Sequence, residues 1–222
     1  MWNLTVSRSI GIFVAPPGAF GMRQTDTYHH GDLRAALLKA AEQELNDNGL
    51  ERFSLRGVAR AAGVSHAAPA HHFGDATGLL TALSVVGWKR FLATQRRHEA
   101  RADGDPLAQL VAAASGYAAF AKAHSALFQL IFSSSKPNRC DPAFQAAGDA
   151  AFNHLVERVN AVTGADAATD CDTMMDVLAT WSLIHGLSSL LNNDYLASIS
   201  HSKRAREDAI RAMVTRYWTG LR

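Results

Sequence analysis

The sequence predicts an all-α protein with about nine helices. Apolar residues recur every three or four positions along most of the 222-residue chain, which is the period of one face of an α-helix. Alanine, the residue with the highest helix propensity, is abundant, and glycine and proline lie mainly near the N-terminus and between the periodic segments. The alternation of valine, isoleucine and threonine that is typical of strands is nearly absent. Helices, rather than a sheet, are therefore expected to form the core.

The composition is that of a protein with a sizeable core. Hydrophobic residues make up 48% of the chain, and the formal net charge is +2, so the overall charge does not indicate a nucleic-acid partner. The two cysteines, Cys140 and Cys171, indicate a reducing compartment rather than a disulfide framework. No apolar run approaches the roughly 20 residues needed to span a bilayer. We therefore expect a cytoplasmic protein without a membrane partner.

Residues 1–24 do not share the helical period of the rest of the chain. They contain Pro16-Pro17-Gly18 and are predicted to form a flexible N-terminal extension. A signal peptide is disfavoured, because the apolar run from Ile10 to Ala15 is shorter than the roughly 7 to 15 residues of a signal-peptide core. Met22 is a second candidate for the start of translation, since the periodic region begins directly after it.

The first helix is predicted to start near Gly31. Leu37 and Leu45 lie on its apolar face, and Asn48-Gly49 is a typical stop signal. We expect this helix to pack across the two short helices that follow it and to complete a three-helix domain over residues 25–75.

Two short helices joined by a tight turn are predicted between Ser54 and Phe73. The Ser54 hydroxyl can cap the first helix, and Val58 lies on its apolar face. Gly63 can adopt the positive φ that the turn requires, and Ser65 can cap the second helix. Such a pair is the helix-turn-helix unit, whose second helix fits the major groove of DNA.

Residues 54–80 resemble the DNA-binding signature of TetR-type transcriptional regulators. The resemblance rests on the turn Ala62-Gly63-Val64-Ser65, on His72-Phe73 at the end of the second helix, and on Asp75 and Leu79-Leu80 after it. It implies a homodimer that binds a palindromic operator in double-stranded DNA and responds to a small-molecule effector. It also implies a second, helical domain for ligand binding and dimerisation.

Two residues depart from the family pattern at positions that usually contact DNA phosphates. Ala70 stands where the family usually has an aromatic residue, and Ala76 stands where it usually has lysine. With Ser65 as the cap, Pro69 is the fourth residue of the recognition helix and removes its first intrahelical hydrogen bond. Residues 23–75 carry six basic and seven acidic side chains, so few phosphate contacts are expected. An alternative therefore stays open, namely a family member with weakened DNA binding that acts as a ligand-binding or partner subunit.

Residues 76–222 are predicted to form a helical bundle. Asp103-Gly104-Asp105-Pro106 is a strong break within it. The helix at Thr173–Leu191 is apolar on nearly every side, so it needs a second partner surface beyond its own domain. Helices are predicted in this part at about 75–98, 107–121, 124–132, 142–164, 173–191 and 203–221.

The segment Trp181–Leu187 resembles the Trp…His-Gly motif of one subgroup of TetR-type C-terminal domains. Members of that family dimerise through their last two long helices, which correspond here to Thr173–Leu191 and Lys203–Leu221. Trp181 and His185, four residues apart on one helix, fit either a ligand contact or plain core packing. The aromatic residues of this part likewise fit either a cavity for an apolar effector or a solid core.

Three sets of residues are predicted to carry function. The DNA-binding set consists of Ser54, Arg56, Ser65, His66, Ala67, His71 and His72. The ligand-binding set consists of Trp88, Phe91, Tyr117, Phe120, Phe128, Trp181 and His185. The dimer-interface set consists of Met174, Leu178, Leu187, Leu191, Ile210, Met213 and Tyr217.

Motifs for catalysis are absent from the sequence. It has no Gly-x-Ser-x-Gly elbow, no glycine-rich phosphate loop and no His-Glu-x-x-His helix. His71 and His72 are adjacent, so their rings cannot easily chelate one metal ion from one helix face. We therefore predict a sequence-specific transcriptional repressor that a small, largely apolar effector releases from its operator. No enzymatic activity, metal or cofactor is predicted.

Overall fold

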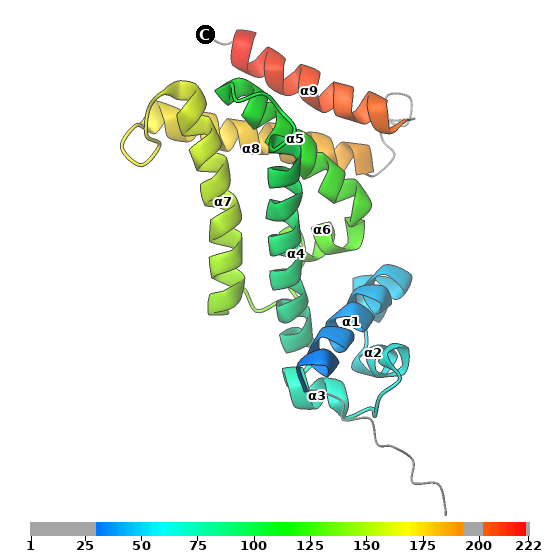
Figure 1. Cartoon of the computed structure of the whole chain (residues 1–222). Coiled ribbons are helices and arrows are strands. Elements are labelled where there is room, and N and C mark those ends of the chain that lie inside the picture. The colour runs from blue at the N-terminus through cyan, green and yellow to red at the C-terminus, as the bar shows by residue number, and fades with distance from the viewer. Residues whose placement is uncertain (1–29, 193–201, 221–222) are drawn as a thin grey trace, which may run out of the picture.

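The computed structural model describes residues 30–192 and 202–220, and most of them are helical (Figure 1). The predicted N-terminal extension lies outside the described residues. Within these two ranges there are nine helices and no strand, which confirms the predicted all-α fold. The helices are α1 (His30–Arg52), α2 (Leu55–Ala62), α3 (Ala68–Phe73), α4 (Ala76–Glu99), α5 (Pro106–Ala123), α6 (Ser125–Phe132), α7 (Pro142–Thr163), α8 (Cys171–Asn192) and α9 (Lys203–Gly220).

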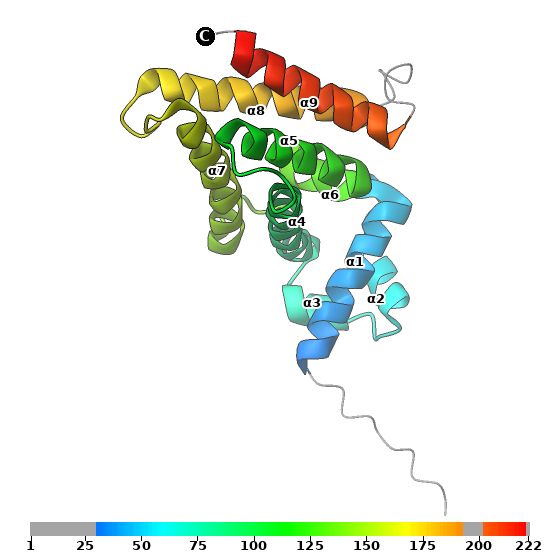
Figure 2. The same ribbon diagram turned by 45° about the horizontal axis from the view of Figure 1, so that its top comes forward.

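Helices α1, α2 and α3 lie together at one end of the molecule, and α4 leads from them into the bundle (Figures 1 and 2). Leu37 and Leu45 of α1 share one core with Val58 of α2 and Leu79 of α4, and all four are at most 1% exposed. Gly49 has a φ of 69° and interrupts the helical conformation of α1 where the stop was predicted, although the helix resumes as far as Arg52. Burial of one apolar stripe per helix thus accounts for this three-helix unit.

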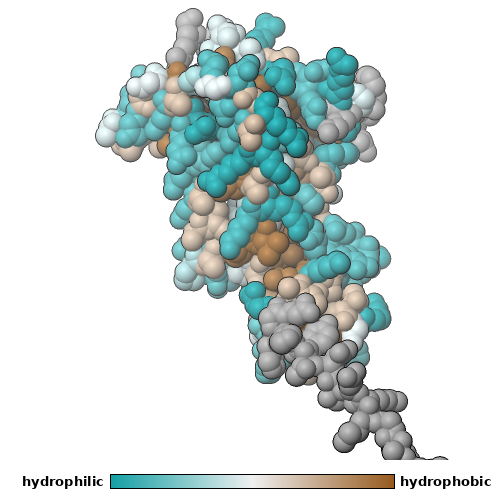
Figure 3. Space-filling view, viewed as in Figure 1, coloured by the Kyte–Doolittle hydropathy of each residue, from teal (hydrophilic) through white to brown (hydrophobic). Residues whose placement is uncertain are grey.

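An ion pair joins this three-helix unit to the bundle. Glu42 of α1 accepts two hydrogen bonds from the guanidinium group of Arg90 of α4, one of them at 3.0 Å. A bidentate ion pair of this kind fixes the orientation of the two side chains as well as their separation. On the face shown in Figure 3, hydrophilic residues surround one hydrophobic area near the middle of the molecule, where α4 runs between its two parts.

Helices α4 and α5 form the centre of the bundle. Every residue of α5 from Leu110 to Tyr117 is buried, because α4 and α7 pack on it from one side and α8 and α9 from the other (Figure 2). Gly116 lies at a close approach of α5 to the backbone of α4. A Cβ atom at this position would lie 2.6 Å from the Cα atom of Gln95, so the crossing has room for glycine alone.

Helix α8 buries one face and exposes another. Val177 and Ile184 are buried, whereas Met175 and Leu178 are 57% and 41% exposed. In length and composition α8 is the one helix in the described part of the chain that could cross a membrane. That is weak evidence, since core helices of soluble proteins share this composition, and α8 packs here against α5, α7 and α9. The apolar outer face of α8 is therefore exposed in the protomer. This is the helix for which the sequence predicts a partner surface.

Candidate functional site

The turn between α2 and α3 forms as the sequence predicts. The Ser54 Oγ atom accepts a hydrogen bond of 3.1 Å from the Gly57 N–H and so caps α2. The Ser54 hydroxyl also lies 3.3 Å from a carboxylate oxygen of the buried Glu44, which ties the cap to α1. Gly63 ends α2 with a φ of 67°, a conformation that glycine adopts without strain.

The recognition helix α3 is shorter than predicted. It begins at Ala68, and its first residues are not capped by any side chain. The expectation that Ser65 caps this helix is therefore wrong, and Ser65 contributes only its carbonyl oxygen, which accepts the Ala68 N–H at 3.0 Å. Because Pro69 stands in the first turn of α3, where an N–H has no intrahelical partner, it fits the helix without loss of a bond.

The predicted DNA-binding residues gather on the outside of α2 and α3 and on the turn between them. Six of the seven are exposed, and His72 is half-buried. Within the described residues neither Arg56 nor the exposed Arg60 forms an ion pair, so both guanidinium groups are free to contact phosphates. The six exposed residues are Ser54, Arg56, Ser65, His66, Ala67 and His71.

Contacts with α1 and α4 hold α3 in place. The guanidinium carbon of Arg34 on α1 lies 5.0 Å from the centre of the Phe73 ring, a cation–π contact. At the other side of Phe73, Asp75 caps α4 by accepting a 2.7 Å hydrogen bond from the Gly78 N–H. The end of α3 and the start of α4 are therefore fixed relative to each other.

A cavity of about 310 Å³ lies between α4, α5, α7 and α8. Most of its wall is aromatic or aliphatic, which suits a small organic molecule. Of the seven predicted ligand-binding residues, four line this cavity, namely Trp88, Phe91, Tyr117 and Trp181.

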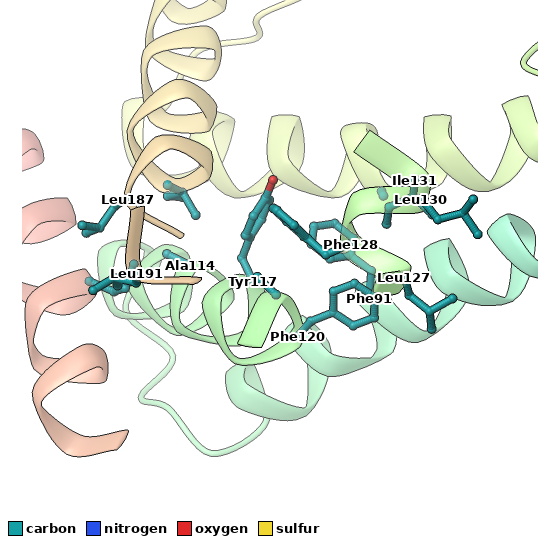
Figure 4. Packing of buried hydrophobic residues seen from close by; sticks show 14 of the residues in the cluster. Phe91, Ala114, Tyr117, Phe120, Leu127, Phe128, Leu130, Ile131, Leu187 and Leu191 are labelled. Atoms are coloured by element: carbon teal, nitrogen blue, oxygen red, sulfur yellow. The ribbon is translucent and has the colours of Figure 1, made fainter. Parts of the chain in front are cut away.

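The other three predicted ligand-binding residues, Phe120, Phe128 and His185, lie outside the cavity wall. Phe120 is fully buried and, like Phe128, belongs to the packed aromatic core (Figure 4). Sequence reasoning missed Phe132 of α6 and Phe152 of α7, which do line the cavity. Their aromatic character was the only signal available, because the face that a helix turns toward a cavity depends on tertiary packing.

His185 lies behind the cavity wall and holds Tyr117. The Tyr117 Oη and His185 Nδ1 atoms are 2.7 Å apart, and the His185 ring stacks on Phe128 with centroids 5.4 Å apart. Burial raises the pKa of Tyr117, although a hydrogen bond with Trp181 opposes the rise, and burial lowers the pKa of His185. Both groups are then neutral at neutral pH, and one hydrogen bond links the Tyr117 hydroxyl with the His185 imidazole. The bond joins α5 to α8 beside the cavity.

Few polar groups reach the cavity. Gln95 of α4 is buried in the wall, and Asp149 of α7 is an exposed residue of the wall. The indole N–H of Trp88 is buried and has no hydrogen-bond partner among the described residues. A buried donor without an acceptor is unfavourable in the folded chain.

The predicted dimer-interface residues are divided between the core and the surface. Leu187, Leu191 and Ile210 are at most 8% exposed, so their side chains are buried within the protomer itself. The remaining four lie at least partly at the surface, and these are Met174, Leu178, Met213 and Tyr217.

Sequence reasoning missed two exposed apolar residues of α8. Met175 and Leu190 are 57% and 44% exposed and lie on the same open face of α8 as Leu178. Gly186 lies on this face too, and a Cβ atom there would meet nothing within 4 Å. The exposed and buried faces lie on different sides of α8. When apolar residues occur all round a helix, the sequence does not show which side will be buried.

A helix-turn-helix unit joined through one long helix to a bundle with an apolar cavity is the architecture of a DNA-binding regulator with a ligand domain. Residues 37–83 match the family model for bacterial regulatory proteins of the tetR family, and residues 110–217 match that for tetracyclin repressor-like C-terminal domains. The chain belongs to the TetR family of transcriptional regulators. No curated protein matches it. The finer assignment to a Trp…His-Gly subgroup stays a prediction.

Solved structures share this fold over most of the chain. A protein with unknown function from Rhodococcus sp. RHA1 is 33% identical, with a TM-score of 0.73 over 88% of this chain and 98% of that one. The TetR family regulator PfmR from Thermus thermophilus is 22% identical, with a TM-score of 0.61 over 84% of this chain and 98% of that one. The fatty acid degradation regulator FadR from Bacillus halodurans is 16% identical, with a TM-score of 0.61 over 87% and 98% of the two chains. The last two likenesses concern the fold alone.

Proposed function

We propose that the protein is a cytoplasmic, non-enzymatic repressor. A homodimer binds a palindromic operator, and a small, largely apolar effector that enters the cavity releases it. The observation that carries this proposal is the 310 Å³ cavity, which has Trp88 and Phe91 in its wall, on the same helix α4 that starts beside α3. A ligand in this cavity contacts the element that positions the recognition helix.

A dimer of this kind carries one α3 helix per half-site. Two recognition helices in successive major grooves lie roughly 34 to 36 Å apart, which sets the spacing of the operator half-sites. Arg56 and the histidines of the turn and α3 supply the contacts to bases and phosphates. Selection of bound sequences from a random DNA pool tests this part of the proposal. We expect a palindrome with half-site centres about 10 base pairs apart, whereas no enrichment would favour the alternative of a ligand-binding or partner subunit.

A second connection between cavity and DNA-binding unit runs through the segment after α6. Phe132 lines the cavity, and four residues later the Lys136 ammonium group donates a 2.6 Å hydrogen bond to the carbonyl oxygen of Leu50 at the end of α1. Lys136 also lies 3.2 Å from the Glu51 carboxylate. A ligand that displaces Phe132 therefore acts on α1 as well as on α4, and a shift of either helix changes the separation of the recognition helices in the dimer.

Lys136→Met is expected to loosen the end of α1. It removes a charge-assisted hydrogen bond to a backbone carbonyl, so amide hydrogens near Leu50 should exchange with solvent about tenfold faster. Hydrogen–deuterium exchange of the full chain measures this. Lys122→Met, which removes an exposed lysine of α5, is the matched control and should leave exchange near Leu50 unchanged. Equal exchange in both variants would show that Lys136 does not hold α1.

Ala76→Lys is expected to steepen the salt dependence of DNA binding. Ala76 is the first residue of α4, next to α3, and a lysine there neutralises about one additional phosphate. The log–log slope of affinity against salt should steepen by about 0.9, for operator and random DNA alike. Titrations of labelled DNA over a range of salt concentrations measure the slope. Ala161→Lys on the exposed side of α7 adds the same charge elsewhere, and a slope no steeper than in that control would mean that position 76 does not approach the backbone.

A further inference from the structure

The charges around the cavity are unevenly distributed. Asp149 is the one ionised side chain among the described residues that line it, and no lysine, arginine or histidine of the described ranges is part of the wall. The Asp149 carboxylate is exposed and makes no hydrogen bond or ion pair with another described residue. Tyr117 adds no charge, because burial raises the pKa of its hydroxyl. The cavity therefore offers a ligand one negative charge and no positive one.

The basic side chains of α7 are engaged with a buried acid. His154 Nε2 lies 2.9 Å from Glu99 Oε1, and Arg158 Nε lies 4.0 Å from the same oxygen. Glu99 is 8% exposed and stands one turn after Gln95 of the cavity wall. Both basic side chains of α7 are thus directed at Glu99, and neither is part of the cavity wall.

The other helices around the cavity likewise contribute no basic side chain to its wall. On α4, Lys89 is exposed and outside the wall, and Arg90 pairs with Glu42. His185 of α8 lies behind Tyr117, and burial lowers the pKa of its imidazole, so it stays uncharged. An anionic ligand that enters the cavity would therefore lose its hydrating water and meet no positive charge in the wall.

Aromatic rings make up much of the rest of the wall. Phe152 of α7 and Trp181 of α8 lie with their centroids 5.7 Å apart, and Trp181 is 36% exposed, so it borders the opening. Trp88 packs edge to face against Phe132 with centroids 4.9 Å apart. The faces of such rings attract cations, tryptophan most strongly, and they offer nothing to anions.

We infer that the cavity selects an aromatic organic cation, whose ring lies against Trp88 and Phe132 and whose positive charge lies near Asp149 and Trp181. This inference rests on the proposed effector role of the cavity and adds the charge of the effector to it. An uncharged molecule of the same shape binds more weakly, and a carboxylate binds most weakly, because it meets the Asp149 charge and no cation.

Three ligands that share one ring system but differ in charge test the effect of ligand charge at nearly constant shape. They are 2-naphthylmethylamine, 2-naphthylmethanol and 2-naphthoate, which at neutral pH carry one positive charge, no charge and one negative charge. Calorimetric titration of the full chain should give at least about tenfold tighter binding for the amine than for the alcohol, and the weakest binding for the carboxylate. A carboxylate that binds as tightly as the amine, or an amine that does not bind, overturns the inference.

Asp149→Asn tests the source of the selectivity. It should weaken amine binding by about tenfold and leave alcohol binding unchanged, and added salt should reduce amine affinity in the wild type more than in the variant. Asp103→Asn removes an exposed acid from the loop between α4 and α5 and is the matched control, which should bind all three ligands like the wild type. Amine affinity that is unaltered in Asp149→Asn overturns the assignment of the charge site.

Release of operator DNA separates this inference from the proposed function. An amine that binds in the predicted order and leaves the operator complex intact would overturn the effector role of the cavity but not its charge selectivity. Release of the operator by the carboxylate at lower concentration than by the amine would overturn the charge selectivity but not the effector role.

Discussion

Replacing Gly116 with alanine should destabilise the protein by about 2 to 3 kcal/mol, because the new methyl group has no room. It would lie 2.6 Å from the Cα atom of Gln95 and 3.0 Å from the carbonyl oxygen of Thr94. Both atoms belong to the backbone of α4, so relief requires a shift of the whole helix against α5. The higher helix propensity of alanine, about 1 kcal/mol over glycine, offsets only part of this strain.

Urea unfolding at a fixed protein concentration measures the effect. Gly148→Ala on α7 is the matched control, since a Cβ atom there would lie at an ordinary 3.7 Å from the Trp88 ring. This control should leave the midpoint unchanged or raise it, by up to about 1 kcal/mol in free energy of unfolding. Equal stability of the two variants would mean that α4 and α5 do not cross as closely as the structure has them.

Leu178→Glu should convert the proposed dimer into a folded monomer and lower operator affinity by about 100-fold or more, because a monomer engages one half-site at a time. Leu178 lies on the open face of α8 with Met175 and Leu190, and Met213 of α9 is a further exposed apolar residue. A set of exposed apolar side chains of this size is typical of an interaction surface. The inserted carboxylate would be buried without a partner in the dimer, yet solvated in the monomer.

Light scattering gives the mass, and titration of labelled operator gives the affinity. Ile210→Glu provides the contrast, because Ile210 is fully buried within the protomer, so that variant should lose folded protein rather than yield a stable monomer. If Leu178→Glu keeps the mass of a wild-type dimer, the subunits meet through another surface. A wild-type protein that is monomeric at micromolar concentration would remove the proposed interface altogether.

Local signals in the sequence were sufficient for most of the fold. Ser54 begins α2 and Gly63 ends it, as a capping residue and a left-handed turn predict, since each depends only on its neighbours in the chain. The start of α3 was misplaced because Ser65 is a good capping residue by type, although Pro69 indicates a start near Ala68 when it is assigned to the first turn. Competing local signals of this sort are resolved only by tertiary packing.

The packing environment of the candidate functional residues was harder to predict than the helices. Phe120 and Phe132 are both aromatic residues of the bundle, but the first is in the solid core and the second lines the cavity. Leu178 and Leu187 are both leucines of α8, but they face opposite sides. Residue type and helical period are the same within each pair, so nothing in the sequence alone distinguishes their roles. The buried indole N–H of Trp88 is likewise visible only in the folded chain.

The continuity of α4 also constrains how this protein can evolve. This single helix of 24 residues begins beside the recognition helix, contributes Trp88, Phe91 and Gln95 to the cavity, and ends at the buried Glu99. A mutation that adapts the cavity to a new ligand therefore alters an element that also sets the position of α3. Changes of ligand preference along α4 should arise together with changes in basal repression, and compensating substitutions are to be expected in α1 or α6. Changes of ligand preference that leave repression unaltered should arise more readily in α7, which borders the cavity and has no extensive contact with α1, α2 or α3.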